Sequence, residues 1–70
     1  MTAVRSQITG TVWQVCVDVG DAVEVGDILT ILESMKMEVP VESPVGGTVT
    51  RVAVQANDTV REGDVVAVVE

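Results

Sequence analysis

The sequence predicts an all-β fold, a flattened eight-stranded antiparallel β-barrel or sandwich with an internal pseudo-two-fold repeat, on three observations. Residues 1–33 align with residues 38–70 without a gap, so one supersecondary unit occurs twice. Valine fills 18 of the 70 positions, and β-branched side chains at this density favour strands over helices. The apolar runs are short and bounded by turn residues, which is typical of buried strands.

The repeat also predicts the domain organisation. Of the 33 aligned pairs, 12 are identical, and the four residues 34–37 lie between the two copies. Each copy has an apolar face that the other must cover, so residues 1–70 should form one domain. A pseudo-two-fold relates the tip at 34–37 to the gap between the chain ends. We therefore expect the tip and the termini at opposite ends of the molecule.

The first strands are predicted at 3–7, as a short edge strand, and at Gly10–Val17. In the second of these the alternation of apolar residues slips by one near Trp13-Gln14, and the equivalent strand of the second copy slips at the same place. A repeated slip indicates a β-bulge or a strand that passes from one sheet to another. Gly20 and Asn57 follow at equivalent positions, and both tolerate the positive φ of a turn.

Each copy then has a short apolar anchor, Val23 or Val60, and a tight turn. In the turns Val25-Gly26-Asp27 and Glu62-Gly63-Asp64, glycine supplies permissive dihedral angles and the aspartate should bind nearby backbone. The apolar runs that follow, Ile28–Leu32 and Val65–Val69, are predicted to be fully buried strands.

Residues 28–34 and 37–42 bracket Met35-Lys36 and predict a β-hairpin with lysine at its tip. The tip contains neither Gly nor Asn, the usual residues of such turns, so its shape should serve recognition. Pro40 and Pro44 confine the second arm to a sheet edge or a strand end.

Composition narrows the class of protein. A net charge of −7 disfavours nucleic acid and anionic membranes as partners, and suits basic protein surfaces. The chain has no histidine and a single cysteine, which argues against a zinc site and excludes an imidazole base. Cys16 is expected to be buried on a strand. The first residues show no signal-peptide pattern, so a cytoplasmic location is expected.

Lys36 is the only lysine of the chain, and Met35 and Met37 flank it. Two large apolar side chains at an exposed tip suit a surface that a partner grips adaptably. A nucleophilic lysine would need desolvation or a neighbouring cation, whereas the nearest charges along the chain are Glu33 and Glu38. Lys36 is therefore predicted to be a target for modification by another enzyme.

Glu33-Ser34-Met35-Lys36-Met37 resembles the Glu-Ala-Met-Lys-Met motif of biotinyl domains, in the biotin/lipoyl attachment family. The resemblance covers the whole chain, because residues 44–49 are similar to the family's Pro-x-x-Gly-x-Val and residues 21–29 to its upstream turn and strand. Ser34 replaces the usual alanine. The inserted "thumb" of some acetyl-CoA carboxylase carriers is absent between Gly10 and Gly26, which leaves open the carboxylase and the acyl acceptor served.

The resemblance implies a carrier and not an enzyme. A biotin protein ligase would attach biotin to Lys36, with Met35 and Met37 recognised by the ligase and the carboxylase. The arm would carry a carboxyl group from a biotin carboxylase to a carboxyltransferase. Lysine plus the valeryl tail spans ~12–14 Å when extended, and tethering raises the effective concentration of the cofactor at both sites. In isolation the chain should be a monomer.

Two alternatives remain. A lipoyl carrier of a 2-oxo acid dehydrogenase complex would share the fold, but such domains usually have Asp before the lysine, where this chain has Met35. In an unmodified structural adaptor, Lys36 would be an ordinary surface charge.

Overall fold

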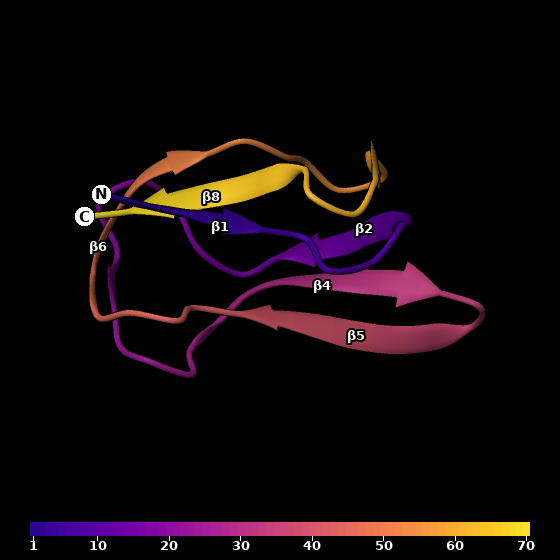
Figure 1. Ribbon diagram of the computed structural model, residues 1–70, viewed down its shortest axis with the longest axis horizontal. Helices are drawn as coiled ribbons and strands as arrows, with labels where there is room; N and C mark the ends of the chain where they lie inside the picture. Colours follow the sequence, from indigo (N-terminus) through magenta and orange to yellow (C-terminus); the bar gives the residue numbers. More distant parts are fainter.

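The computed structural model describes residues 1–70 and contains eight strands and no helix. The strands are β1 (Thr2–Arg5), β2 (Gly10–Val15), β3 (Ala22–Val23), β4 (Ile28–Ser34), β5 (Met37–Glu42), β6 (Gly47–Val52), β7 (Thr59–Val60) and β8 (Val65–Val69). They form two four-stranded sheets, with strand orders β1-β8-β6-β3 and β5-β4-β2-β7 (Figure 1). All pairs are antiparallel. The predicted β-sandwich is confirmed, although the sheets do not close into a barrel.

The internal repeat determines the sheet topology. A shift of 37 residues converts β1, β8, β6 and β3 into β5, β4, β2 and β7, so one sheet order becomes the other. The register follows the same rule: Thr2 pairs with Val69 in the first sheet, and Val39 pairs with Leu32 in the second. The two copies therefore exchange strands, because each sheet contains strands from both halves of the chain.

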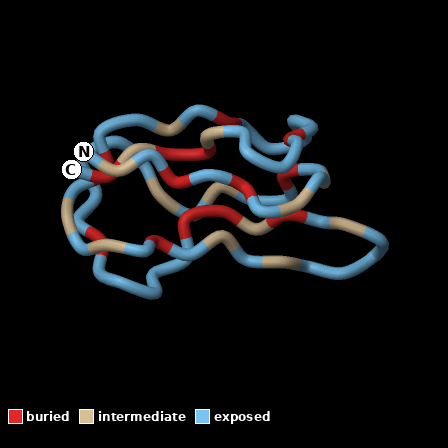
Figure 2. Tube along the Cα trace, in the orientation of Figure 1, coloured by how far each residue is buried: buried red, intermediate tan, exposed pale blue.

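The core lies between the two sheets (Figure 2). It consists of 11 buried apolar residues: Val4, Val12, Val23, Leu29, Leu32, Val49, Val54, Val60, Val66, Ala67 and Val69. Both short anchors predicted from the sequence, Val23 and Val60, belong to it. No aromatic side chain is buried, since Trp13 is half exposed. Small branched side chains thus fill a thin core, as expected for a domain of this size.

The repeated phase slip is a β-bulge in both copies. The register of β2 against β4 shifts between Val12 and Gln14, and that of β6 against β8 shifts between Val49 and Arg51. The bulge turns Val15 toward the core after Val12, at the cost of one unpaired residue.

Three expectations about individual residues are wrong. Cys16 is exposed. Side chains in an extended chain point alternately to opposite sides, and because Val15 and Val17 pack against the core, the residue between them points outward. The strand itself ends at Val15, two residues earlier than predicted. Ile28 is 44% exposed. It is the first residue of β4 and pairs with Glu42, and the register shift that follows it brings Leu29 and Thr30 to the core instead.

The same type of hydrogen bond occurs in four turns. The side chains of Asp21, Asp27, Asp58 and Asp64 each accept a bond from the backbone N–H three residues earlier, at 2.9 Å in every case. This confirms the backbone bonds predicted for Asp27 and Asp64. Gly20 and Asn57 have φ values of 98° and 77°, so the predicted left-handed turns are also confirmed.

Gly20 and Asn57 provide a paired test of these turns. A Cβ at Gly20 would meet no atom within 4 Å, so only the backbone conformation opposes a substitution there. We expect Gly20→Val to lower the free energy of unfolding by roughly 1–2 kcal/mol, the left-handed penalty of a side chain with a Cβ. Asn57→Gly should leave stability unchanged within error. Equal denaturant midpoints for Gly20→Val and the parent protein would contradict the assignment.

The molecule is elongated, with dimensions of 31 × 18 × 18 Å. The β4–β5 hairpin projects from one end, and both termini lie together at the other end (Figure 1). This arrangement confirms the opposite placement of tip and termini predicted from the pseudo-two-fold. The protein contains no helix with the length and apolarity required to cross a membrane.

Candidate modification site

The predicted hairpin forms with the predicted boundaries. β4 ends at Ser34, β5 begins at Met37, and these two residues are the last pair of the ladder. β4 is an inner strand that pairs with both β2 and β5, and Leu29 and Leu32 bury it in the core. β5 is an edge strand, which accommodates Pro40 as predicted. The hairpin is therefore a rigid extension of the sheet, anchored through β4.

The tip is a two-residue turn with an unusual composition. Met35 and Lys36 have φ values of 52° and 65°, so both central residues adopt the left-handed conformation that a type I′ turn requires. Asn-Gly is the common sequence for such a turn, whereas side chains without a local polar group are disfavoured there by roughly 1–2 kcal/mol each. Strain of this kind concentrates at functional sites. Turn preference therefore does not explain the presence of these side chains at the tip.

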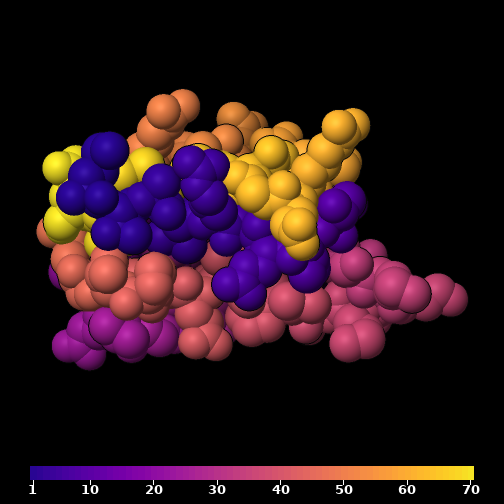
Figure 3. Space-filling model, viewed as in Figure 1, coloured from indigo at the N-terminus to yellow at the C-terminus, as the bar shows by residue number.

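All three side chains at the tip face solvent. Met35 is 92% exposed and Met37 is 64% exposed, and Lys36 is exposed between them. The exposure predicted for the two methionines is confirmed. In the space-filling view the tip forms the narrow projection at one end of the molecule (Figure 3). A partner can therefore reach the lysine amine and both thioethers without any rearrangement of the core.

The base of the tip is acidic. Glu33 and Glu38 are directly opposite each other across the hairpin, and both are exposed. Like charges in this position destabilise a strand pair, so the pair does not serve the fold. In the sequence, both residues stand out only as the charged neighbours of Lys36. The sequence contained a signal for this pair. A two-residue turn at Met35-Lys36 sets the register of the hairpin, and in that register Glu33 and Glu38 are opposite each other.

The amine is presented to solvent, and no cavity encloses it. The surface has two pockets, and neither is lined by Met35, Lys36 or Met37. No group of three or more His, Cys, Asp or Glu side chains could hold a metal ion. The hairpin accordingly presents the primary amine of Lys36 at the surface of the protein.

A protein-family model described as "Biotin-requiring enzyme" matches residues 2–69 of the chain. The chain belongs to this biotin/lipoyl family. The match spans both copies of the repeat and includes the hairpin tip, so the resemblance inferred from the motif extends over the entire fold. The cofactor indicated by this family model and by the biotinylated relatives below is covalently attached biotin, and the domain is a carrier part of biotin-dependent enzymes.

Curated relatives are similar over part of their length. The chain is 50% identical over 38 residues to "Biotinylated protein TB7.3" of Mycobacterium tuberculosis (strain ATCC 25618 / H37Rv), covering 54% of each chain. It is also 50% identical over 38 residues to the "Biotin/lipoyl attachment protein" of Bacillus subtilis (strain 168), covering 54% of this chain and 52% of that one. The aligned stretch thus spans about half the length of these relatives.

Solved structures match over the full fold. The Kluyveromyces lactis urea carboxylase superposes with a TM-score of 0.93 at 38% identity, over 99% of this chain and 6% of that one. A single-chain, multi-domain long-chain acyl-CoA carboxylase superposes with a TM-score of 0.87 at 33% identity, over 94% of this chain and 6% of that one. In both cases this chain matches a small part of a much larger carboxylase.

Proposed function

We propose that Lys36 is the residue to which a biotin protein ligase attaches biotin, and that the loaded domain carries a carboxyl group between two active sites. One observation supports this most directly. The single lysine of the chain occupies a strained, fully exposed turn between two exposed methionines, in a member of the biotin/lipoyl family. Neither core packing nor turn chemistry favours these residues at this position.

Attachment forms an amide between the Lys36 Nζ and the carboxyl carbon of activated biotin. The neutral Lys36 amine would form the C–N bond with its nitrogen lone pair, the bond between the acyl carbon and the adenylate oxygen would break so that AMP leaves, and the nitrogen would then release one proton. When bound, biotin supplies a ring nitrogen that accepts and releases the carboxyl group. The chain supplies the tether, and its hairpin holds the tether at the end of the long axis, away from the termini.

The exposed position suits recognition by several partners in turn. Met35 and Met37 offer adaptable apolar contacts, and Glu33 and Glu38 offer charge that a basic surface would complement. The partners we propose are the ligase, a biotin carboxylase and a carboxyltransferase. Support for the last two comes from the solved relatives, which are a urea carboxylase and a long-chain acyl-CoA carboxylase.

The test of attachment is the intact mass of the chain after expression with a biotin protein ligase and biotin, followed by peptide mapping. We expect one biotin adduct on the peptide that contains Lys36. The same experiment with a lipoyl ligase and lipoate should give no adduct. A lipoyl adduct alone would favour a lipoyl carrier, and a bare chain in both experiments would favour an unmodified adaptor.

The carrier role predicts dependence on a partner. Biotinylated protein alone should hydrolyse no ATP and fix no bicarbonate. With a biotin carboxylase present, bicarbonate-dependent ATP turnover should saturate as the concentration of the biotinylated protein rises. Unmodified protein at the same concentrations is the control and should support no turnover. ATP-dependent carboxylation by the purified chain without a partner would contradict the proposal.

The methionines should affect recognition more than stability. Truncation of a buried methionine to alanine typically costs 2–5 kcal/mol, but Met35 and Met37 are largely exposed. We therefore expect the double variant Met35→Ala/Met37→Ala to melt within a few degrees of the parent protein, while the rate of biotinylation falls. Thermal melts and labelling time courses measure the two effects separately. A large loss of stability with unchanged labelling would reverse the roles assigned to these side chains.

A further inference from the structure

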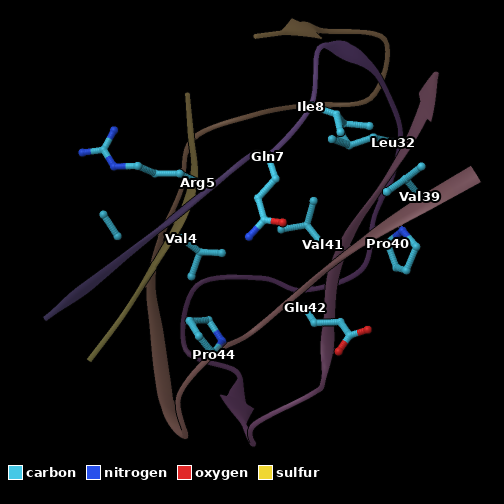
Figure 4. A pocket seen from close by; sticks show the side chains of 11 residues that line it. Val4, Arg5, Gln7, Ile8, Leu32, Val39, Pro40, Val41, Glu42 and Pro44 are labelled. Atoms are coloured by element: carbon cyan, nitrogen blue, oxygen red, sulfur yellow. The ribbon is translucent and has the colours of Figure 1, made fainter. Parts of the chain in front are cut away.

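A groove runs between the two edge strands β1 and β5, on the side where the sandwich is open. It has a volume of about 530 Å³, within the range of small-molecule sites. Val4, Leu32, Val39 and Val41 contribute apolar lining, and Ile8 closes the end nearest the hairpin (Figure 4). Because β1 and β5 are equivalent strands of the repeat, the pseudo-two-fold axis passes between the two walls of the groove.

Three equivalent pairs of lining residues differ between the two sides of the groove: Ala3/Pro40, Arg5/Glu42 and Gln7/Pro44. Gln7 lines one side and its repeat counterpart Pro44 lines the other. The Gln7 side chain extends over the groove toward Val41 (Figure 4). It takes part in none of the side-chain hydrogen bonds of the protein. The groove therefore combines an apolar lining with the Gln7 amide, which is free to donate and to accept, and with two charged residues, Arg5 and Glu42. Arg5 donates a hydrogen bond to the Gly63 carbonyl oxygen.

The groove is within reach of Lys36. β5 leads from the tip along one wall, and at ~3.4 Å per residue it places Val39 about 10 Å and Val41 about 17 Å from Lys36. An extended biotinyl-lysine arm of ~12–14 Å ends between these two residues. The bicyclic ring, which begins where the arm ends, would then lie beside Val41 and Gln7.

The chemistry of the groove matches that of the ring. The ureido group presents N–H donors and a carbonyl acceptor side by side, and a glutamine amide presents the complementary acceptor and donors. The sulfur-containing ring is apolar and fits the aliphatic lining. We propose that this groove is a resting site for the biotinyl group on Lys36 of the same chain, with Gln7 pairing to the ureido edge. The inference rests on the attachment proposed above.

The test compares ¹H–¹⁵N spectra of the unmodified and biotinylated protein. We expect shifts of the Gln7 side-chain NH₂ and of the backbone amides of Ile8 and Val41, in addition to those at the tip. Gln7→Ala should abolish the shifts at Ile8 and Val41, and Gln55→Ala, at an exposed glutamine outside the groove, should preserve them. Shifts confined to residues 33–39 in the biotinylated protein would overturn the inference.

Capture by avidin gives a second readout. If the ring spends about three quarters of its time in the groove, the parent protein should be captured about fourfold more slowly than Gln7→Ala. Gln55→Ala should be captured at the parental rate. Equal rates for all three proteins would overturn the resting site but leave attachment intact. An absent adduct at Lys36 in the mass spectrum would refute the attachment and the resting site together.

Discussion

Lys36→Arg should fold as the parent protein does and carry no biotin. Arginine keeps the positive charge and can occupy the same exposed turn, but its guanidinium is a very poor acyl acceptor. Since the chain has no other lysine, no side-chain amine remains for the ligase. Intact mass and avidin blotting after expression with the ligase measure the loss directly. We expect labelling to fall from complete to undetectable, the largest effect on function of any single substitution.

The parent protein provides the matching control for this variant. Acylation removes one positive charge, so the net charge of −7 becomes −8 and the modified form should migrate further toward the anode in a native gel. Lys36→Arg should show no such shift, and its melting temperature should equal that of the unmodified parent. Biotin found on the Lys36→Arg protein would disprove the assignment of the site.

Gly10→Ala should be strongly destabilising for so small a substitution. A Cβ at Gly10 would lie 2.7 Å from the Glu33 carbonyl oxygen, and that backbone is held by pairing with Thr11 on one side and Glu38 on the other. The contact cannot be relieved without displacing the base of the hairpin. Overpacking of this kind costs ~1–3 kcal/mol, and at 4–8 °C per kcal/mol for a small domain the melting temperature should fall by about 4–24 °C.

Gly46→Ala is the matched control. A Cβ at Gly46 would be 3.7 Å from the Val23 carbonyl oxygen, an ordinary contact, so this variant should melt close to the parent protein. The adjacent Gly47 is the repeat counterpart of Gly10, and a Cβ there would collide with the Glu70 carbonyl and come within 3.0 Å of Val69. Gly47→Ala should therefore resemble Gly10→Ala. Equal melting temperatures for Gly10→Ala and Gly46→Ala would show that the strand approach is not tight.

The sequence by itself determined the features that depend on residues close together in the chain. Alternation and β-branching placed the strands, and Gly20 and Asn57 marked the left-handed turns. The bulge appeared as a slip in alternation, and the repeat made each of these signals visible twice. The hairpin with Lys36 at its tip followed from the same local patterns, because a short turn between two apolar runs brings its own arms together.

The tertiary structure decided what depends on pairing between distant segments. Gly10 and Gly47 were visible only as an identical pair, and their need to be glycine arises from the close approach of Glu33 and Glu70, each 23 residues further along the same copy of the repeat. Ser6 and Ser43 were likewise an identical pair. Each is buried with its hydroxyl bonded to a backbone carbonyl two residues on, at 2.6 Å.

Cys16 shows the limit of arguing from residue type. Its apolar character suggested burial, but the phase of the strand after the bulge points it outward. The groove beside Gln7 was beyond any local pattern, because its two walls, β1 and β5, are at least 32 residues apart in the chain. Sequence periodicity specifies which way side chains alternate, and only the packing of two sheets specifies which edges remain open.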